Sequence, residues 1–119
     1  MNLENKIVVI SGGASGLGLA TARYMVRQKG AKVALLDMNQ DAGAAAVEEL
    51  GDDNALFCLT DVTSEADVDK AVEAIMVKFG AIHADVNAAG IVAPAKILDR
   101  DGKASSVENF KAVINVNLI

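Results

Sequence analysis

Apolar residues along the chain form short β-branched runs that alternate with longer stretches of helical spacing. Residues 6–10, 32–37 and 55–60 are nearly continuous apolar runs. Runs of this length and composition predict strands that are buried on both faces. Residues 82–87 predict a fourth strand, which leads into a stretch of small residues.

Each of the first three strands is followed by a predicted helix. The first helix ends at Gly30, the second runs from Asn39 as its cap to about Leu50, and the third begins after Ser64. The first helix carries its apolar stripe on Leu17, Ala20, Thr21, Tyr24 and Met25. The third has a capping box of Ser64 and Asp67, an apolar face of Val68, Val72, Ile75, Met76 and Phe79, and an end at Gly80.

The remaining residues predict a loop and a last helix. Residues 91–106 contain Pro94 and Gly102 and predict the loop. Residues 107–119 predict the helix, because Phe110, Val113 and Asn117 recur at helical spacing. This apolar helix has no C-cap, so we expect the chain to be the amino-terminal portion of a longer enzyme.

Strand and helix alternate strictly, which predicts parallel pairing through right-handed crossovers. The expected fold class is α/β, a doubly wound parallel sheet of the Rossmann type in one domain over residues 1–119. We expect it to be truncated after the start of the helix that follows strand four. Ligands of such sheets bind beyond the carboxyl ends of the strands. The unusual residue clusters of this chain all lie at those ends.

Composition narrows the function classes. Hydrophobic residues make up 52% of the 119 residues and charged residues 23%, which excludes a disordered chain. The net charge is −5 and no Lys/Arg cluster is longer than a pair, which disfavours nucleic-acid binding. Cys58 is the only cysteine, so neither a disulfide framework nor a Cys-rich metal site is expected. No signal core or transmembrane run is present, and we expect a soluble, cytoplasmic protein with no membrane partner.

A glycine loop at residues 11–18 follows the first strand and opens the first helix. Gly12 can turn the chain sharply, Gly16 lets the backbone approach a diphosphate, and Gly18 lets the helix lie close to the sheet. The helix N-terminus then presents unpaired N–H groups to the phosphates. A glycine-rich turn that merely links strand to helix is the alternative. No Gly-Lys-Ser/Thr follows, so the loop is not a P-loop.

Asp37 ends the second strand, nineteen residues after Gly18, where an acidic residue binds the adenosine ribose. A 2′-phosphate beside it would meet repulsion of about 4 kcal/mol at about 4 Å and an effective dielectric of 20. No Lys or Arg lies between Val33 and Asp69 or in the glycine loop. NAD is therefore predicted over NADP. Alternatively, Asp37 is only a turn residue that flanks a helix.

Two further clusters follow strands three and four. Asp61 and Val62 border the adenine in one interpretation, and in the other Asp61 and Thr63 only prepare the cap of the next helix. Spacing does not decide between them. After strand four, residues 87–90 are small enough to leave room for a flat ligand, and Asn87 can tie neighbouring strands together. A plain strand exit has a similar sequence.

These motifs, in this order, resemble those of the short-chain dehydrogenase/reductases. The matching elements are Ser11-Gly12-Gly13-Ala14-Ser15-Gly16-Leu17-Gly18, Asp61-Val62, Asn87-Ala88-Ala89-Gly90 and Val116-Asn117-Leu118. Within the family, the chain is most similar to the type 2 3-hydroxyacyl-CoA dehydrogenase branch, also known for 17β-hydroxysteroid activity. Lys78-Phe79-Gly80, Lys96, Asp101-Gly102-Lys103 and Glu108-Asn109-Phe110 support that narrower resemblance. The resemblance covers about the first half of a family member.

The resemblance implies an NAD-dependent oxidoreductase of fatty acid metabolism that transfers a hydride between NAD and a secondary alcohol. The implied substrate is a 3-hydroxyacyl-CoA or a steroid-like alcohol, and a homotetramer is implied as well. Asn117 corresponds to a catalytic residue that holds a water of the proton relay; from spacing alone it is a buried amide. The implied cofactor-binding residues are Gly12, Ser15, Gly16, Leu17, Gly18, Asp37, Met38, Asp61, Val62, Asn87, Ala88, Ala89 and Gly90.

The catalytic Ser, Tyr and Lys of the family have no counterpart within residues 1–119. Tyr24 is the only tyrosine, Gln28 follows it by four residues, and its place on the apolar stripe predicts a core residue. We therefore expect the chain alone to bind NAD weakly without dehydrogenase turnover. A 3-oxoacyl-carrier-protein reductase, which usually uses NADPH, and a non-catalytic nucleotide-binding module are the alternatives. Asp85 departs from the family pattern, which has an apolar residue at its place in the strand.

Overall fold

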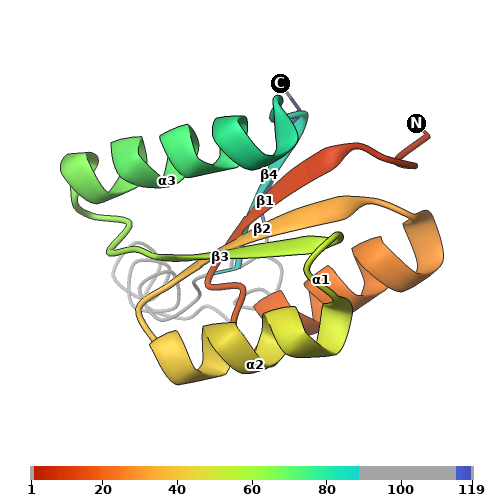
Figure 1. Cartoon of the computed structure of the whole chain (residues 1–119), viewed down its shortest axis with the longest axis horizontal. Helices are drawn as coiled ribbons and strands as arrows, with labels where there is room; N and C mark the ends of the chain where they lie inside the picture. The colour runs from red at the N-terminus through yellow and green to blue at the C-terminus, as the bar shows by residue number, and fades with distance from the viewer. Residues whose placement is uncertain (1, 89–114, 119) are drawn as a thin grey trace, which may run out of the picture.

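The computed structural model describes residues 2–88 and 115–118, and in this part strands and helices alternate as expected (Figure 1). The elements are β1 Ile7–Ser11, α1 Gly16–Lys29, β2 Lys32–Asp37, α2 Gln40–Leu50, β3 Ala55–Leu59, α3 Glu65–Phe79, β4 Ala84–Asn87 and β5 Asn115–Leu118. The predicted fold class, four strands and first three helices are confirmed, with shifts of one or two residues at some ends.

The sheet has the order β3-β2-β1-β4-β5, and its first four strands are parallel. The chain moves outward from β1 to β3 and then returns to the other side of β1 as β4. As a result α1 and α2 cover one face of the sheet and α3 covers the other (Figure 1). The strand order reverses between β1 and β4, which is the point where such sheets bind ligands.

The predicted helix over residues 107–119 is wrong where the structure describes it. Residues 115–118 form β5, which pairs antiparallel with β4. Asn-Val-Asn-Leu alternates polar and apolar residues, a strand pattern, and the β-branched Val113 and Ile114 precede it. The edge of β4 supplies the backbone partners that such a segment needs. The predicted loop over residues 91–106 lies outside the described residues.

The core consists of two apolar layers, one on each face of the sheet. Ile10 and Leu35 are fully buried on the α1–α2 side, and Ile75 of α3 is fully buried on the other. Burying a side chain of this size contributes roughly 1.5–3 kcal/mol. Two small residues of α1, Gly18 and Ala22, lie buried against the rest of the molecule. This helix therefore packs closely, with little room for large side chains.

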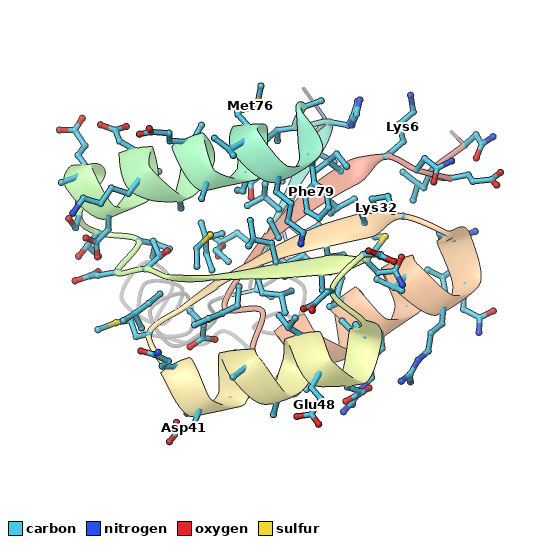
Figure 2. All side chains as sticks on the ribbon, in the orientation of Figure 1. Lys6, Lys32, Asp41, Glu48, Met76 and Phe79 are labelled. Carbon is cyan, nitrogen blue, oxygen red and sulfur yellow. The ribbon has the colours of Figure 1, made fainter. Side chains whose placement is uncertain are left out.

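Tyr24 is not a core residue, contrary to the sequence prediction. Its side chain is 50% exposed, and the Lys29 ammonium lies 5.7 Å from its ring centroid. The buried face of α1 is narrower than its apolar stripe. The buried face of α3 also differs in part from the predicted apolar face. Ala71 and Ile75 are buried, while Met76 projects outward (Figure 2).

His83, just before β4, and Asp85, within it, differ in their hydrogen bonding. The Ile7 N–H donates to His83 Nδ1 at 2.9 Å, so the His83 side chain has a hydrogen-bond partner. Asp85 stands in register with Val9 of β1 and with Asn117 of β5. Within the described residues, no hydrogen bond or ion pair joins its carboxylate to another group. Its partial burial raises the pKa of the carboxyl above the ordinary value.

Candidate functional site

The glycine loop turns the chain away from β1 at the carboxyl edge of the sheet. Gly12 has φ 72° and Gly16 has φ 54°, a left-handed region that glycine adopts without steric strain. The Gly12 N–H donates to the Leu36 carbonyl at 2.7 Å, which fixes the turn against the end of β2. The sharp turn expected at Gly12 is confirmed.

Gly18 allows the first turn of α1 to lie directly on the glycine loop. A Cβ atom at Gly18 would overlap the Gly12 carbonyl oxygen and would lie 2.9 Å from the Gly13 Cα. The close approach of Gly18 is therefore to the glycine loop itself. The sequence prediction had the helix lying close to the sheet instead. A Cβ atom at Gly16, in contrast, would meet no heavy atom within 4 Å. The space beside Gly16 is open, as the approach of a ligand requires.

Gly13 also has a packing role, which the sequence analysis missed. A Cβ atom there would lie 2.8 Å from the Ile10 carbonyl oxygen and 2.9 Å from Leu35 Cδ2. The signal was the Gly12-Gly13 doublet directly after a buried strand. Two glycines at such a point indicate that the loop folds back onto the strand ends.

The N-terminus of α1 has no cap from its own sequence. The N-cap residue Ser15 makes no side-chain cap bond, and no acidic residue lies in the first turn. The first N–H groups of a helix have no intrahelical partners and carry positive partial charge. Behind a glycine loop, such an end suits the phosphates of a nucleotide.

Asp37 lies beside this helix end and contacts the glycine loop. Its Oδ2 accepts the Ala14 N–H at 3.1 Å, and its Oδ1 accepts the Asn39 N–H at 3.0 Å. The contact with Asn39 agrees with the alternative interpretation of a turn residue, and the contact with Ala14 places the carboxylate next to the loop. Asp37 therefore flanks the turn before α2 and also contacts the glycine loop.

Three apolar side chains are exposed around the same edge. Met38 after β2 is 69% exposed, Val62 after β3 is 46% exposed and Leu17 at the start of α1 is 36% exposed. Exposed apolar side chains beside polar loop groups are typical of binding surfaces for flat rings. All three belong to the predicted cofactor-binding residues.

Asp61 takes part in the cap structure before α3. Its Oδ1 accepts the Thr63 N–H at 2.9 Å and the Thr63 hydroxyl at 2.6 Å. These hydrogen bonds, first the one from the hydroxyl, lower the pKa of the Asp61 carboxyl. The Asp61 N–H donates to Asp67 Oδ2 at 3.0 Å. These bonds agree with the interpretation that Asp61 and Thr63 prepare the cap of the next helix. A contact of Asp61 with adenine stays a prediction.

The end of β4 is linked to the glycine loop. The Ser11 hydroxyl donates to Asn87 Oδ1 at 3.2 Å, and the Ala88 N–H donates to the Ser11 carbonyl at 2.9 Å. Asn87 thus joins β4 to β1, as expected. Ala89 and Gly90 lie outside the described residues. Asn117 lies in β5 rather than on a helix, so its predicted setting is wrong, and its catalytic role stays a prediction.

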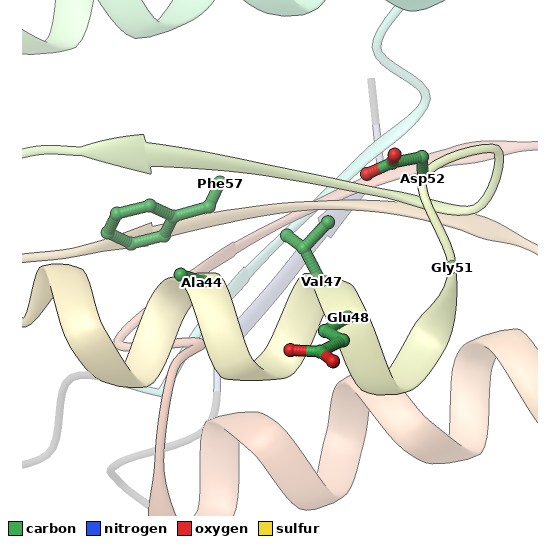
Figure 3. A pocket seen from close by; sticks show the side chains of 6 residues that line it. All are labelled: Ala44, Val47, Glu48, Gly51, Asp52 and Phe57. Carbon is green, nitrogen blue, oxygen red and sulfur yellow. The ribbon is translucent and has the colours of Figure 1, made fainter.

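A depression of about 560 Å³ lies between α2 and β3 and extends from the middle of that strand toward its amino end (Figure 3). Gly51 and Asp52, which line it, precede β3, so the depression opens near the amino end of that strand. Its floor includes Val47 and Phe57. It is separate from the strand ends that carry the glycine loop and Asp37.

Other kinds of site receive no support from residues 2–88 and 115–118. They contain no group of three or more His, Cys, Asp or Glu side chains arranged to hold a metal ion. Cys58 is half-buried on β3, and burial raises the pKa of its thiol, which disfavours the reactive thiolate. In the same part of the chain, no helix has the length and apolar character needed to cross a membrane.

Similar proteins identify the family to which this chain belongs. The family model described as short chain dehydrogenase matches residues 6–119. The chain belongs to the short-chain dehydrogenase family. It is 42% identical over 119 residues to 3-hydroxyacyl-CoA dehydrogenase type-2 of Homo sapiens, covering 99% of this chain and 45% of that protein. It is 35% identical over 115 residues to 3-beta-hydroxysteroid dehydrogenase of Comamonas testosteroni, covering 97% and 42%. This short-chain dehydrogenase chain spans about half the length of these relatives.

Solved structures of the family share the fold of this short-chain dehydrogenase chain. A 3-ketoacyl-(acyl-carrier-protein) reductase from Brucella melitensis, complexed with NADH, matches with a TM-score of 0.62 and 38% identity. The match covers 68% of this chain and 33% of that one. A short-chain dehydrogenase from Bacillus anthracis matches with a TM-score of 0.63 and 30% identity, covering 68% and 34%.

Proposed function

We propose that this chain binds NAD at the carboxyl edge of its sheet and forms the cofactor-binding part of an NAD-dependent dehydrogenase. One observation carries the proposal: the uncapped N-terminus of α1 and the Asp37 carboxylate lie at the same edge. The 3.1 Å hydrogen bond from Ala14 to Asp37 joins them. An anion-binding helix end beside a carboxylate matches a diphosphate followed by a ribose diol.

The residues of this edge are assigned to the parts of NAD in order. The first N–H groups of α1, beside Gly16, would hold the diphosphate. Asp37 would accept hydrogen bonds from the adenosine ribose. Leu17, Met38 and Val62 would cover the adenine. The predicted contacts toward the nicotinamide-side ribose are Ala88 and Gly90. When bound, NAD supplies a hydride acceptor at C4 of its nicotinamide, and this chain's residues supply binding and orientation.

The proposed reaction is oxidation of a secondary alcohol, with a 3-hydroxyacyl-CoA as substrate and a 3-oxoacyl-CoA as product. The 42% identity to a 3-hydroxyacyl-CoA dehydrogenase supports this choice. The relative that acts on 3β-hydroxysteroids supports a steroid-like alcohol more weakly. For the whole enzyme we propose a homotetramer on the resemblance to the family.

A second candidate is reduction of a 3-oxoacyl group on a carrier protein. The Brucella reductase, at 38% identity, is a complex with NADH. A preference for NAD therefore does not separate this candidate from the first. Substrate assays of the full-length enzyme with acyl-CoA and acyl-carrier-protein substrates separate them.

Titration calorimetry of the 119-residue chain tests the cofactor. We expect NAD to bind at least tenfold more tightly than NADP, because the Asp37 carboxylate repels a 2′-phosphate. Asp37→Ser should remove most of this preference. Asp41→Ser should keep it, because Asp41 carries the same charge on α2 but projects away from the sheet (Figure 2). Tighter binding of NADP than of NAD would contradict the proposal.

The absence of turnover is tested separately. The sequence contains no Tyr-x-x-x-Lys element, and Tyr24 lies half exposed on α1. Mixed with NAD and a 3-hydroxyacyl-CoA, the 119-residue chain should therefore produce NADH no faster than a protein-free control. Turnover clearly above that control would show that other residues of this chain can act as the general base.

A further inference from the structure

The last two residues of β2 accept hydrogen bonds from the glycine loop at the proposed nucleotide site. The Leu36 carbonyl accepts the N–H groups of Gly12 at 2.7 Å and of Gly13 at 3.4 Å. The next N–H in the chain, that of Ala14, goes to Asp37 Oδ2 at 3.1 Å. Three consecutive N–H groups of the glycine loop therefore point toward β2. Among them, only Ala14 relies on a side chain.

The Ala14 N–H has few other options. Ala14 is 2% exposed, so water cannot readily replace the carboxylate as its acceptor. Directly after it, residues 15–17 are exposed, and the first N–H groups of α1 begin there. The hydrogen bond at Ala14 is thus the last fixed point of the loop before the amides that face a ligand.

The Asp37 carboxylate can hold the loop and a ribose together. An ionised carboxylate has about four acceptor positions on its two oxygens. Each oxygen accepts one backbone N–H within the described structure, from Ala14 and from Asn39. Acceptor positions remain for ribose hydroxyls, so binding of a ribose does not require these bonds to break.

We propose that Asp37 is a positioning residue for the glycine loop, in addition to its part in the proposed ribose site. By holding Ala14, it keeps the loop in the shape that presents the first amides of α1 to a diphosphate. The affinity for a diphosphate without any ribose therefore depends on Asp37. This inference rests on the proposed function only for the identity of the ligand.

Simple electrostatics makes the opposite prediction, which gives a sharp test. Asp37 is negative and lies near the proposed anion site, so removing its charge should by itself strengthen binding of an anion. If Asp37 positions the loop, Asp37→Asn should weaken it, because the neutral amide has one acceptor oxygen for two backbone N–H groups. Asp37→Ser should weaken it more, because it removes both carboxylate oxygens. Inorganic pyrophosphate is a suitable probe because it lacks both ribose and base.

The experiment follows the ¹⁵N-labelled 119-residue chain by NMR. In Asp37→Ser, which removes both acceptor oxygens, we expect the Ala14 amide to exchange with solvent at least tenfold faster, with a smaller increase in Asp37→Asn. We also expect the dissociation constant for pyrophosphate to rise at least fivefold. Asp41→Asn is the matched control, since it removes the same charge without touching the loop; its amide exchange should be unchanged and its pyrophosphate binding equal or slightly tighter.

The outcomes separate the two proposals. Unchanged Ala14 exchange in Asp37→Ser, or pyrophosphate binding in that variant as tight as in Asp41→Asn, overturns the positioning role. If the unaltered chain binds neither pyrophosphate nor NAD, the proposed function and the diphosphate half of this inference both fail, while amide exchange still decides the hold on Ala14. If the Asp37 variants unfold, NMR of the unaltered chain keeps the test. A coupling through the hydrogen bond between the Ala14 amide nitrogen and the Asp37 carboxyl carbon is expected, and its absence overturns the inference.

Discussion

The start of α1 differs from the starts of α2 and α3 in how its backbone donors are satisfied. Asn39 caps α2 by accepting the Ala42 N–H at 3.0 Å, and Ser64 caps α3 by accepting the Asp67 N–H at 3.2 Å. Both helices also carry acidic residues in their first turns. At α1, Ser15 makes no cap bond and the first turn contains no acid.

This difference separates two capped helix ends from one whose first amides could serve the proposed diphosphate site. A cap contributes about 1 kcal/mol, so the start of α1 forgoes stability that the other two helices have. The glycine loop in front of it is instead held by β2 and by Asp37. The start of α1 is thus supported through the backbone that precedes it. Its first amide groups stay available for hydrogen bonds to a ligand.

The largest effect is expected from Gly18→Ala. A methyl group there overlaps the Gly12 carbonyl, so the free energy of unfolding should fall by about 3 kcal/mol or more. Gly16→Ala is the control: its methyl group meets no atom, and only the left-handed conformation opposes it, at about 1–2 kcal/mol. Urea unfolding measures both. An equal loss in the two variants would mean that α1 does not rest on its loop.

A cap introduced at α1 should exchange binding for stability. Ser15→Asp places a carboxylate at the bare helix end, so we expect the free energy of unfolding to rise by about 0.5–1 kcal/mol. The same charge should weaken NAD binding at least tenfold, about 1.4 kcal/mol, by repelling the diphosphate. Ser64→Asp, at the capped end of α3, should leave NAD affinity unchanged. Unweakened NAD binding in Ser15→Asp would place the diphosphate elsewhere.

Removal of the caps should affect the three helices unequally. Asn39→Ala and Ser64→Ala should each lower the free energy of unfolding by about 1 kcal/mol, because each deletes a cap bond. Ser15→Ala deletes none, and its effect should stay within about 0.5 kcal/mol. Thermal and urea unfolding of the three variants provide the measurement. A loss at Ser15 as large as at Ser64 would remove the contrast.

The smallest effect concerns the pH dependence of the loop before α3. Hydrogen bonds from Thr63 lower the pKa of Asp61 in the folded chain. A lowered carboxyl pKa contributes stability above the unfolded pKa of about 4, and this contribution is lost as the pH falls through the folded value. Thr63→Val removes the hydroxyl donor, so the pKa of Asp61 should rise toward its ordinary value. Carbon-detected NMR titration follows it, and an unchanged pKa would show that the hydroxyl bond does not form.

Features with a local cause could be predicted from the sequence. The apolar runs predict β1 to β3 because a doubly covered strand needs apolar residues on both faces. Asn39 and Ser64 act as caps because their partners lie three residues away in the chain. Asp37 could be placed at the site because the carboxyl ends of parallel strands meet at one edge.

Features that depend on tertiary contacts could not be predicted. Tyr24 belongs to an apolar stripe, and only the narrow contact of α1 with the rest of the molecule leaves it half exposed. Residues 115–118 fit two periodicities, and pairing with β4 selects the strand. The bond from Ala14 to Asp37 joins the loop after β1 to the last residue of β2, so no spacing rule contains it.

The crowding at Gly13 and Gly18 has a practical consequence for protein engineering. A library intended to change nucleotide preference should keep both invariant, because any larger residue there collides with main-chain atoms. Gly12 should be kept as well, because its φ of 72° favours glycine. Met38 and Val62 are exposed and free of such collisions, so variation there should be tolerated. Useful diversity is therefore to be sought on the outer rim of the site.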